Sequence, residues 1–310
     1  MAQIRHTTVS PASDTPFSMA YRDVAPPNGT VMKGTILLIH GFPQTSYQYR
    51  HVLPRLARRG YRCIAPDYRG AGGSGTPNPS STISHNDFRK SVMAADLIAL
   101  LDALDIKEKV NVVGHDIGAM VAYPLARDFP ARVRSLVFGE CPLPGTSTYR
   151  RDTTEPERIR QQFQFYFHSV PEMAAALVEG KERVYVEHFL KKINYAEDAF
   201  SLVDINEYVS AYSKPGAFKN AAEVYAAFPE DAKENRARLE RDGKLKVPTL
   251  VLSGEHSRHA AEAEEMVSEV VEDGKWEART VSAAAHYVAE ENPEGFVKEV
   301  VSFIERSDKL

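Results

Sequence analysis

Short apolar segments rich in β-branched residues alternate with longer amphipathic segments along this chain of 310 residues. Apolar runs of this kind are typical of strands buried on both faces, so their alternation with helices predicts a mostly parallel sheet with helices on both faces. The predicted strands are residues 34–40, 61–67, 110–116, 133–140, 249–255 and 276–282. The predicted helices between them are residues 47–59, 88–104, 117–128, 260–271 and 293–306. Residues 4–10 and 17–24 alternate only partly and are expected to add an antiparallel edge hairpin, which gives an eight-stranded sheet.

A long stretch without a strand pattern separates the predicted strands 133–140 and 249–255. It runs from residue 143 to residue 245, is rich in aromatic and charged residues, and shows helical patterns. A helical insertion between two strands of one sheet is expected to cap the carboxyl ends of the strands, where ligands of open α/β sheets bind. The chain is therefore predicted to contain a core, residues 1–142 and 246–310, and a helical cap, residues 143–245.

The composition argues against several classes of partner. The formal net charge is −4 and charged residues make up 26% of the chain, so nothing marks a basic surface for nucleic acid or an anionic membrane. No apolar run is long enough for a signal-peptide core or a membrane span, which predicts a soluble cytoplasmic protein. Cys63 and Cys141 lie in or just after apolar strand-like runs, so two buried thiols are expected rather than a disulfide. Two cysteines alone cannot build a zinc site, and no metal or cofactor is expected.

The segment GHDIG at residues 114–118 lies between a predicted strand and a predicted helix. It has the small-x-nucleophile-x-small form of a nucleophile elbow, a turn so tight that the residues flanking the nucleophile must be small. The side chain of Asp116 would project at the helix N-terminus, where free N–H groups and the helix dipole favour an anion. An aspartate before a helix is more often only an N-cap, so the pattern gains its weight from two other elements at matching positions.

The first of these elements is the HGFP motif at residues 40–43, which ends the predicted strand 34–40. In nucleophile-elbow enzymes a backbone N–H group of this loop and that of the residue after the nucleophile form an oxyanion hole, which assigns Phe42 and Ile117. The second is His286, which follows the last predicted strand, where the histidine of such a site is carried. Without the elbow, these two elements would be a plain turn and a surface histidine.

The sequence around these motifs resembles the α/β-hydrolase epoxide hydrolases over nearly the whole chain. HGFPQTSYQYRHVLPRLARRGYRCIAPDYRGAGGSG at residues 40–75 is similar to their N-terminal block, and VVGHDIGAMVAY at residues 112–123 is similar to their nucleophile block. The cap segments HSVPEMAAALVEGKERVYVEHF at residues 168–189 and YVSAYSKPGAF at residues 208–218 resemble the Cif-type subgroup. The resemblance implies an α/β-hydrolase fold, and the cap residues suggest a mostly apolar, small-molecule epoxide as substrate.

The resemblance also implies how the site residues would act. Asp116 would attack an epoxide carbon and form a hydroxyalkyl ester, while the hydroxyl of Tyr212 in the cap would donate a proton to the opening oxygen. His286 would activate water, which would hydrolyse the ester to a diol with the developing charge held in the oxyanion hole. The residues expected to contact the substrate are Gln164, Phe42, Ile117 and His115.

An acidic residue must orient His286, and the chain offers two candidates. Glu255 follows the predicted strand 249–255, the usual place in the wider fold. Glu140 follows the predicted strand 133–140, where the Cif-type subgroup carries its acid, and the local sequence FGECPLP favours it. The sequence leaves both residues open.

The chain departs from the Cif-type pattern at Gln164, which stands where the subgroup pairs its tyrosine with a histidine. A glutamine amide can donate a hydrogen bond to the epoxide oxygen but cannot give up a proton at neutral pH, which would leave Tyr212 as the only acid. His168 lies one helical turn further on and is a candidate substitute. Ala285 stands before His286 where the family usually has glycine, and only a small geometric adjustment is expected there.

Two other functions stay open. A dehalogenase uses the same aspartyl ester, but haloalkane dehalogenases hold the halide with a tryptophan after the nucleophile, and haloacetate dehalogenases have arginines at the positions of Ile117 and Met120. The only tryptophan, Trp276, lies in a predicted core strand. A binding protein without strong activity is the second alternative, because the fold alone proves no activity. The sequence also leaves room for a homodimer.

Overall fold

The structure, a computed structural model, describes residues 2–12, 14–77 and 84–307. Its strands are β1 (Ile4–Val9), β2 (Phe17–Val24), β3 (Gly34–Ile39), β4 (Tyr61–Pro66), β5 (Val110–His115), β6 (Val133–Gly139), β7 (Thr249–Gly254) and β8 (Trp276–Val281). Within the described residues these strands form one eight-stranded sheet in the order β1-β2-β4-β3-β5-β6-β7-β8. β1 pairs antiparallel with β2, β2 pairs antiparallel with β4, and the other pairs are parallel. The predicted mostly parallel sheet with an antiparallel edge hairpin is confirmed.

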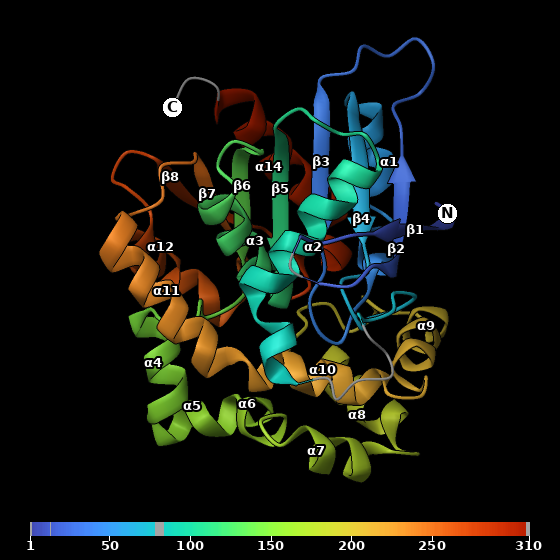
Figure 1. Cartoon of the computed structure of the whole chain (residues 1–310), viewed down its shortest axis with the longest axis vertical. Helices are drawn as coiled ribbons and strands as arrows, with labels where there is room; N and C mark the ends of the chain where they lie inside the picture. Colours follow the sequence, from blue (N-terminus) through green and yellow to red (C-terminus); the bar gives the residue numbers. More distant parts are fainter. Residues whose placement is uncertain (1, 13, 78–83, 308–310) are drawn as a thin grey trace.

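Helices cover both faces of the sheet (Figure 1). Those outside the long insertion are η1 (Ser46–Tyr49), α1 (Leu53–Arg58), η2 (His85–Phe88), α2 (Lys90–Ala103), α3 (Ile117–Asp128), η3 (Arg258–Glu262), α12 (Ala263–Val270), α13 (Val288–Glu291) and α14 (Pro293–Ser307). Alternate side chains of β3 serve the two faces: Leu37 and Ile39 join the core with α2 and α3, whereas Ile36 and Leu38 join the core with α1 and α14. Because both faces are buried, the strand is apolar throughout rather than alternating.

Two predicted helices are broken in the structure. Residues 47–59 form the short turn η1 and then α1, which has Pro54 in its first turn, where a missing N–H group breaks no helical hydrogen bond. Residues 260–271 divide into η3 and α12, and η3 begins early because the Ser257 hydroxyl accepts a hydrogen bond from the N–H group of His259. Trp276 begins β8, the predicted strand of the core sheet, which lies at the edge of that sheet, and its side chain is partly buried against the hydrophobic core.

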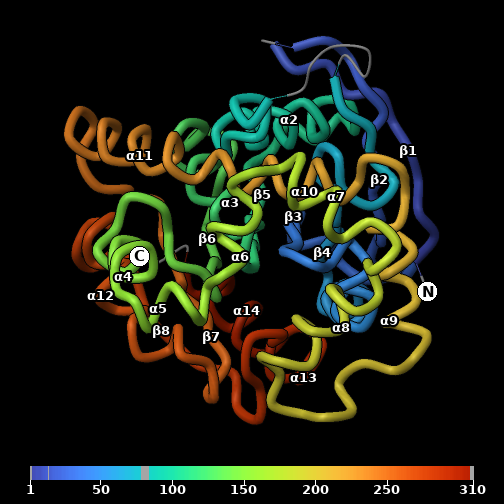
Figure 2. Tube along the Cα trace, turned by 90° about the horizontal axis from the view of Figure 1, so that it is seen from below, coloured from blue at the N-terminus to red at the C-terminus, as the bar shows by residue number. Residues whose placement is uncertain are grey.

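The insertion between β6 and β7 is helical throughout its regular parts. Its helices are α4 (Ser147–Thr154), α5 (Pro156–Gln161), α6 (Phe163–Phe167), α7 (Pro171–Val178), α8 (Glu182–Lys192), α9 (Leu202–Tyr212), α10 (Ala217–Ala226) and α11 (Phe228–Asp242). Figures 1 and 2 show these helices gathered at one end of the sheet, across the carboxyl ends of the parallel strands. We keep residues 143–245 as the proposed cap.

The strand order determines at which edge of the sheet the site lies. β3 lies between β4 and β5, so the chain leaves β3 first to one side and later to the other. Ligands of such sheets bind outside the carboxyl ends of the strands at this reversal. The loop after β3 carries Phe42, the turn after β5 carries Asp116, the loop after β6 carries Glu140 and the loop after β8 carries His286. All four therefore meet beneath the cap.

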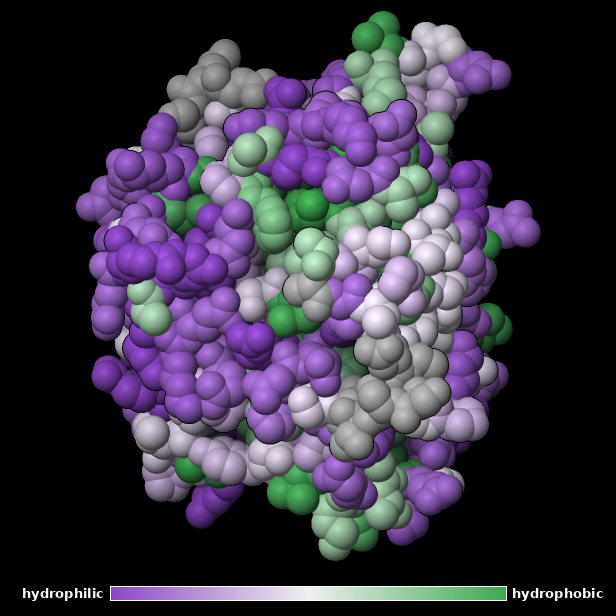
Figure 3. Space-filling model, in the orientation of Figure 1, coloured by the Kyte–Doolittle hydropathy of each residue, from purple (hydrophilic) through white to green (hydrophobic). Residues whose placement is uncertain are grey.

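The outer surface is mixed in character. Figure 3 shows a largely hydrophilic face, with hydrophobic side chains at the lower edge over the cap. Val170, Met173 and Leu177 at helix α7 are among the exposed apolar residues. No described helix combines the length and the apolar character needed to cross a membrane. Cys63 and Cys141 are both buried and unpaired, as predicted. The homodimer stays a prediction.

Candidate active site

The turn that carries Asp116 is strained and can only be built with small neighbours. Asp116 has a φ of 53° and is the N-cap residue of α3. A Cβ atom on Gly118 would overlap the backbone carbonyl of Ile39, and one on Gly41 would lie 2.5 Å from the Cβ of Asp116. Strain of this kind persists only where the surroundings fix it, and it is common at active sites. The glycines of the predicted elbow are thus explained by the close approach of β3, β5 and α3.

The carboxylate of Asp116 lies against the two predicted backbone donors. Its Oδ1 atom accepts a hydrogen bond from the N–H group of Phe42 at 2.9 Å, and the N–H group of Ile117 also donates to the carboxylate. Burial raises the pKa of Asp116, while the nearby His286 and these two N–H groups oppose the rise. The structure therefore brings together Asp116, Phe42 and Ile117 as the sequence predicted.

His286 links Asp116 to a buried acid. Its Nε2 atom is 3.9 Å from Asp116 Oδ2, and its Nδ1 atom is 3.1 Å from Glu140 Oε2. Glu140 in turn accepts hydrogen bonds from the N–H group of Gly254 at 2.8 Å and from the hydroxyl of Ser257 at 2.7 Å. Burial lowers the pKa of His286, but the hydrogen bond and the charge of Glu140 outweigh it and raise the pKa above its ordinary value.

Glu255, the other candidate acid, lies elsewhere. Its side chain is 54% exposed, its Oε2 atom lies 3.8 Å from His256 Nε2, and it accepts a weak hydrogen bond from the N–H group of Ala283 at 3.3 Å. Of the two candidates, the structure places Glu140 and not Glu255 against His286.

The ring of His115 does not reach the substrate side of the site, in contrast to its predicted role in substrate binding. It is buried, and its Nε2 atom lies 2.6 Å from the backbone carbonyl oxygen of His286. Burial lowers the pKa of His115 well below its ordinary value, so the ring is neutral and its Nε2–H group donates to the carbonyl. His115 holds the loop that carries His286.

A cavity of about 350 Å³ opens onto Asp116 and His286. Its apolar wall is formed by Phe42, Phe165, Phe189, Ile193 and Tyr225. A cavity of this size and lining is typical of small-molecule sites. The predicted mostly apolar pocket with aromatic walls is present on this side.

The cap presents a different tyrosine from the one the sequence favoured. Tyr212 is absent from the described cavity lining, and its hydroxyl donates a hydrogen bond to the backbone carbonyl of Gln44 at 3.3 Å. Tyr225 of α10 lines the cavity, and no described residue forms a hydrogen bond with its hydroxyl. Burial and the charge of Asp116 raise the pKa of Tyr225 well above its ordinary value, so the phenol keeps its proton. With 14 tyrosines in the chain, no local signal singled out Tyr225.

Gln164 lines the cavity as predicted, whereas His168 does not. The amide nitrogen of Gln164 lies 2.7 Å from the side-chain oxygen of Gln162. His168 is fully buried, and its Nε2 atom lies 2.8 Å from the hydroxyl of Tyr185. Burial lowers the pKa of His168 to about 3, so it holds no proton to give at neutral pH. His168 is a packing residue of the cap rather than a substitute acid.

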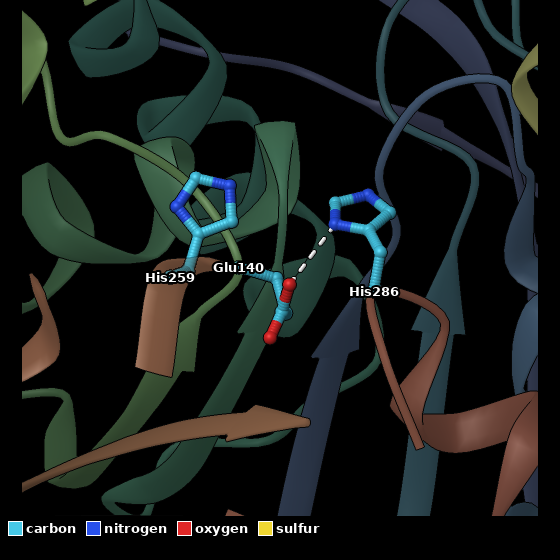
Figure 4. Close-up of side chains that lie close together, drawn as sticks. All are labelled: Glu140, His259 and His286. Atoms are coloured by element: carbon cyan, nitrogen blue, oxygen red, sulfur yellow. Dashed lines mark hydrogen bonds and ion pairs between the residues drawn. The ribbon is translucent and has the colours of Figure 1, made fainter. Parts of the chain in front are cut away.

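A second histidine, His259 of η3, lies beside the acid and was not predicted. Figure 4 shows its ring on the side of Glu140 opposite His286. One ligand atom from each of Glu140, His259 and His286 lies within 4.8 Å of the others, a spacing that could hold a metal ion. The Nδ1 atom of His286 is already engaged by Glu140, however. The expectation of a metal-free site stays a prediction.

Known proteins share the fold described above. The model of the alpha/beta hydrolase fold family matches residues 34–267. A soluble epoxide hydrolase from Corynebacterium sp. (strain C12) is 32% identical over 271 residues, which are 86% of this chain and 89% of that relative. The crystal structure of Cfl2 wild-type from Burkholderia cenocepacia is 28% identical, with a TM-score of 0.82 over 97% of this chain and 96% of that chain.

The Cif epoxide hydrolase from Acinetobacter nosocomialis is 22% identical, with a TM-score of 0.82 over 97% of this chain and 88% of that chain. At that identity the similarity shows the shared fold, and the Cif-type subgroup stays a prediction. The family match and the relative from Corynebacterium cover most of the chain. The chain belongs to the epoxide hydrolases of the α/β-hydrolase fold family.

Proposed function

We propose that this protein hydrolyses epoxides through a covalent ester on Asp116. The observation that carries the proposal is the position of the Asp116 carboxylate. Its Oδ1 atom is held by the N–H group of Phe42 at 2.9 Å, and its Oδ2 atom faces His286 Nε2 at 3.9 Å. The soluble epoxide hydrolase from Corynebacterium supports this choice of reaction.

In the first step, Oδ2 of Asp116 attacks an epoxide carbon, and the bond between that carbon and the ring oxygen breaks. The developing alkoxide takes the proton of the Tyr225 hydroxyl, because a phenol is a stronger acid than an alcohol. The amide of Gln164 can donate a hydrogen bond to the same oxygen but no proton. We therefore assign the acid role to Tyr225 rather than to Tyr212.

In the second step, His286 takes a proton from water, and the resulting hydroxide attacks the ester carbonyl carbon of Asp116. The charge that develops on Oδ1 lies against the N–H group of Phe42, and the N–H group of Ile117, which also donates to the carboxylate, is the second proposed donor. Glu140 stabilises the imidazolium of His286. Collapse of the intermediate breaks the ester bond, and the departing alkoxide takes the proton of the His286 imidazolium, which releases the diol. The second proton of the water returns to the phenolate of Tyr225, and Asp116 is a carboxylate again.

The geometry does not favour the dehalogenase alternative. Ile117 and Met120, which occupy the positions of the halide and carboxylate clamps, are both apolar and buried. Trp276 lies at the far edge strand β8. The described residues that line the cavity include no tryptophan.

Covalent trapping tests the proposal. His286→Gln should form the ester but hydrolyse it slowly, so incubation with styrene oxide should raise the intact mass by the mass of one epoxide. Peptide mapping should place the adduct on Asp116, and Asp116→Asn should show none. The proposal fails if neither styrene oxide nor a panel of alkyl and bulky polycyclic epoxides gives an adduct or a diol. A catalytically weak binding protein of this fold would then be the better interpretation.

A further inference from the structure

One part of the cavity is not apolar. Lys192, the last residue of α8, and Arg258, the first residue of η3, come from segments far apart in the chain and line the same cavity as Asp116. Lys192 is exposed, which places it where the cavity meets solvent. Its Nζ atom donates a hydrogen bond to the backbone carbonyl of Gln161 at 3.0 Å and lies 5.4 Å from the centre of the Phe163 ring. These contacts hold the ammonium group at the rim of the cavity.

The charge of Lys192 is not neutralised within the described residues. No described carboxylate lies within ion-pair distance of it, whereas its neighbour Lys191 pairs with Glu187 at 2.6 Å. Arg258 is paired with Asp152 at 3.0 Å, and Arg158, which also faces Asp152, pairs with Glu262 at 2.6 Å. Among the described residues of the rim, Lys192 is therefore the cation without a carboxylate partner.

Two further observations favour the binding of an anionic group here. Burial and the charge of Arg258 lower the pKa of Lys192, so the two cations are close enough to repel each other. The other polar groups at this part of the lining include the side-chain amides of Gln161, Gln162 and Asn194. The carboxylates among the described lining residues are Asp116 and Glu140, and both are engaged with His286. An anionic group of a ligand would therefore contact hydrogen-bond donors and cations here, and both carboxylates of the described lining are already engaged.

We infer that the substrate is an epoxide that also carries a carboxylate. Its epoxide ring lies at Asp116, and its carboxylate lies at Lys192 beside Arg258. This inference rests on the proposed function and adds the substrate class. A cavity of about 350 Å³ has room for roughly a dozen non-hydrogen atoms at about 30 Å³ each. An aromatic epoxide with a carboxylate on the far side of its ring fits these limits and places its aryl group against Phe42 and Phe189.

A matched pair of substrates tests the inference. Styrene oxide with a para-carboxylate and styrene oxide with a para-carboxamide have nearly the same size and differ in charge. The variants are Lys192→Met, which keeps most of the stem, Lys192→Arg, which keeps the charge, and Lys191→Met as the control for net charge. We expect kcat/KM for the carboxylate to fall by roughly tenfold in Lys192→Met, with the amide changed by less than about twofold. Lys192→Arg should recover most of the loss, and Lys191→Met should leave both substrates unchanged.

A binding measurement separates this inference from the proposed function. Calorimetric titration of para-toluate and para-toluamide requires no turnover. If toluate binds more tightly than toluamide to the native protein and loses that advantage in Lys192→Met, the anion site stands even if no epoxide is turned over. If toluate binds equally to the native protein and to Lys192→Met, or if Lys192→Met lowers kcat/KM equally for both epoxides, the inference is overturned.

Discussion

The ring of His115 lies beneath the loop of His286 and donates a hydrogen bond to the His286 backbone carbonyl at 2.6 Å. The residue before Asp116 thus holds the loop that carries His286. His115→Phe keeps a ring of similar shape but removes the donor, so the imidazole of His286 should lose its alignment. We expect kcat to fall by about tenfold with little change in KM, and His115→Gln, which keeps a donor, to recover part of the loss. Steady-state kinetics of diol formation check this, and an unchanged kcat in His115→Phe would remove His115 from the positioning of His286.

A buried ion pair joins the cap to the core, and its loss should lower the free energy of unfolding. Lys90 of α2 donates to Asp231 of α11 at 2.7 Å, and both side chains are about 2% exposed. Asp231→Asn leaves the Lys90 charge buried without its partner, which should lower the free energy of unfolding by about 3–5 kcal/mol. The double variant Lys90→Met with Asp231→Leu removes both charges and should be considerably more stable than Asp231→Asn. Urea denaturation measures both, and equal stability of Asp231→Asn and the native chain would contradict the prediction.

The acid beside His286 should set the pH dependence of the second step. Glu140 raises the pKa of His286 above its ordinary value of 6.5, and only neutral His286 can take a proton from water. The rate should therefore rise with pH through that raised pKa. Glu140→Gln removes the charge, so the rise should move to lower pH while the plateau rate falls by roughly 10²–10⁴-fold. Glu255→Gln should change neither, and the pH profile of kcat compares the two variants directly.

The same shift has a consequence for stability. Since the pKa of His286 is higher in the folded state than in the unfolded state, its protonated form stabilises the fold. This contribution is fully present below the ordinary pKa of 6.5 and is lost as the pH rises through the raised, folded-state pKa. Glu140→Gln should abolish this dependence. Unfolding free energies measured on both sides of that range in the native chain and in the variant test the sign.

The two cap tyrosines should differ in their effect on ring opening. Tyr225→Phe removes the proton donor that lines the cavity, so formation of the ester should slow by about 10²-fold or more. Tyr212→Phe removes a hydroxyl that donates to the carbonyl of Gln44 and should change the rate by only a few-fold. Single-turnover kinetics with styrene oxide separate ester formation from its hydrolysis. A larger loss in Tyr212→Phe than in Tyr225→Phe would restore the assignment that the sequence suggested.

The core of the site was predictable because its residues sit at strand ends. Asp116 and Glu140 directly follow β5 and β6, and apolar strands are recognisable from composition alone. The glycines around Asp116 carry a further signal, since the close approach of β3 excludes larger side chains. Local sequence therefore determined both the order of the strands along the chain and the chemistry at their ends.

The cap was less predictable because its contacts are set by packing between helices. Tyr212 and Tyr225 lie on α9 and α10, and nothing in either segment shows which hydroxyl faces the cavity. The outcome depends on Gln44, a core residue whose backbone carbonyl accepts from Tyr212. His259 was missed for the same reason, because its approach to Glu140 depends on how η3 folds back after β7.

The hydrogen bond from Phe42 to Oδ1 makes the two oxygens of Asp116 unequal. In the proposed reaction Oδ2 leaves with the product, and an oxygen from water takes its place on the carboxylate. As long as Oδ1 keeps its hydrogen bond from the N–H group of Phe42, the side chain does not rotate between cycles. Asp116 then keeps Oδ1 throughout and exchanges the other oxygen in every turnover. Each diol after the first therefore contains an oxygen atom that entered the protein from water one cycle earlier.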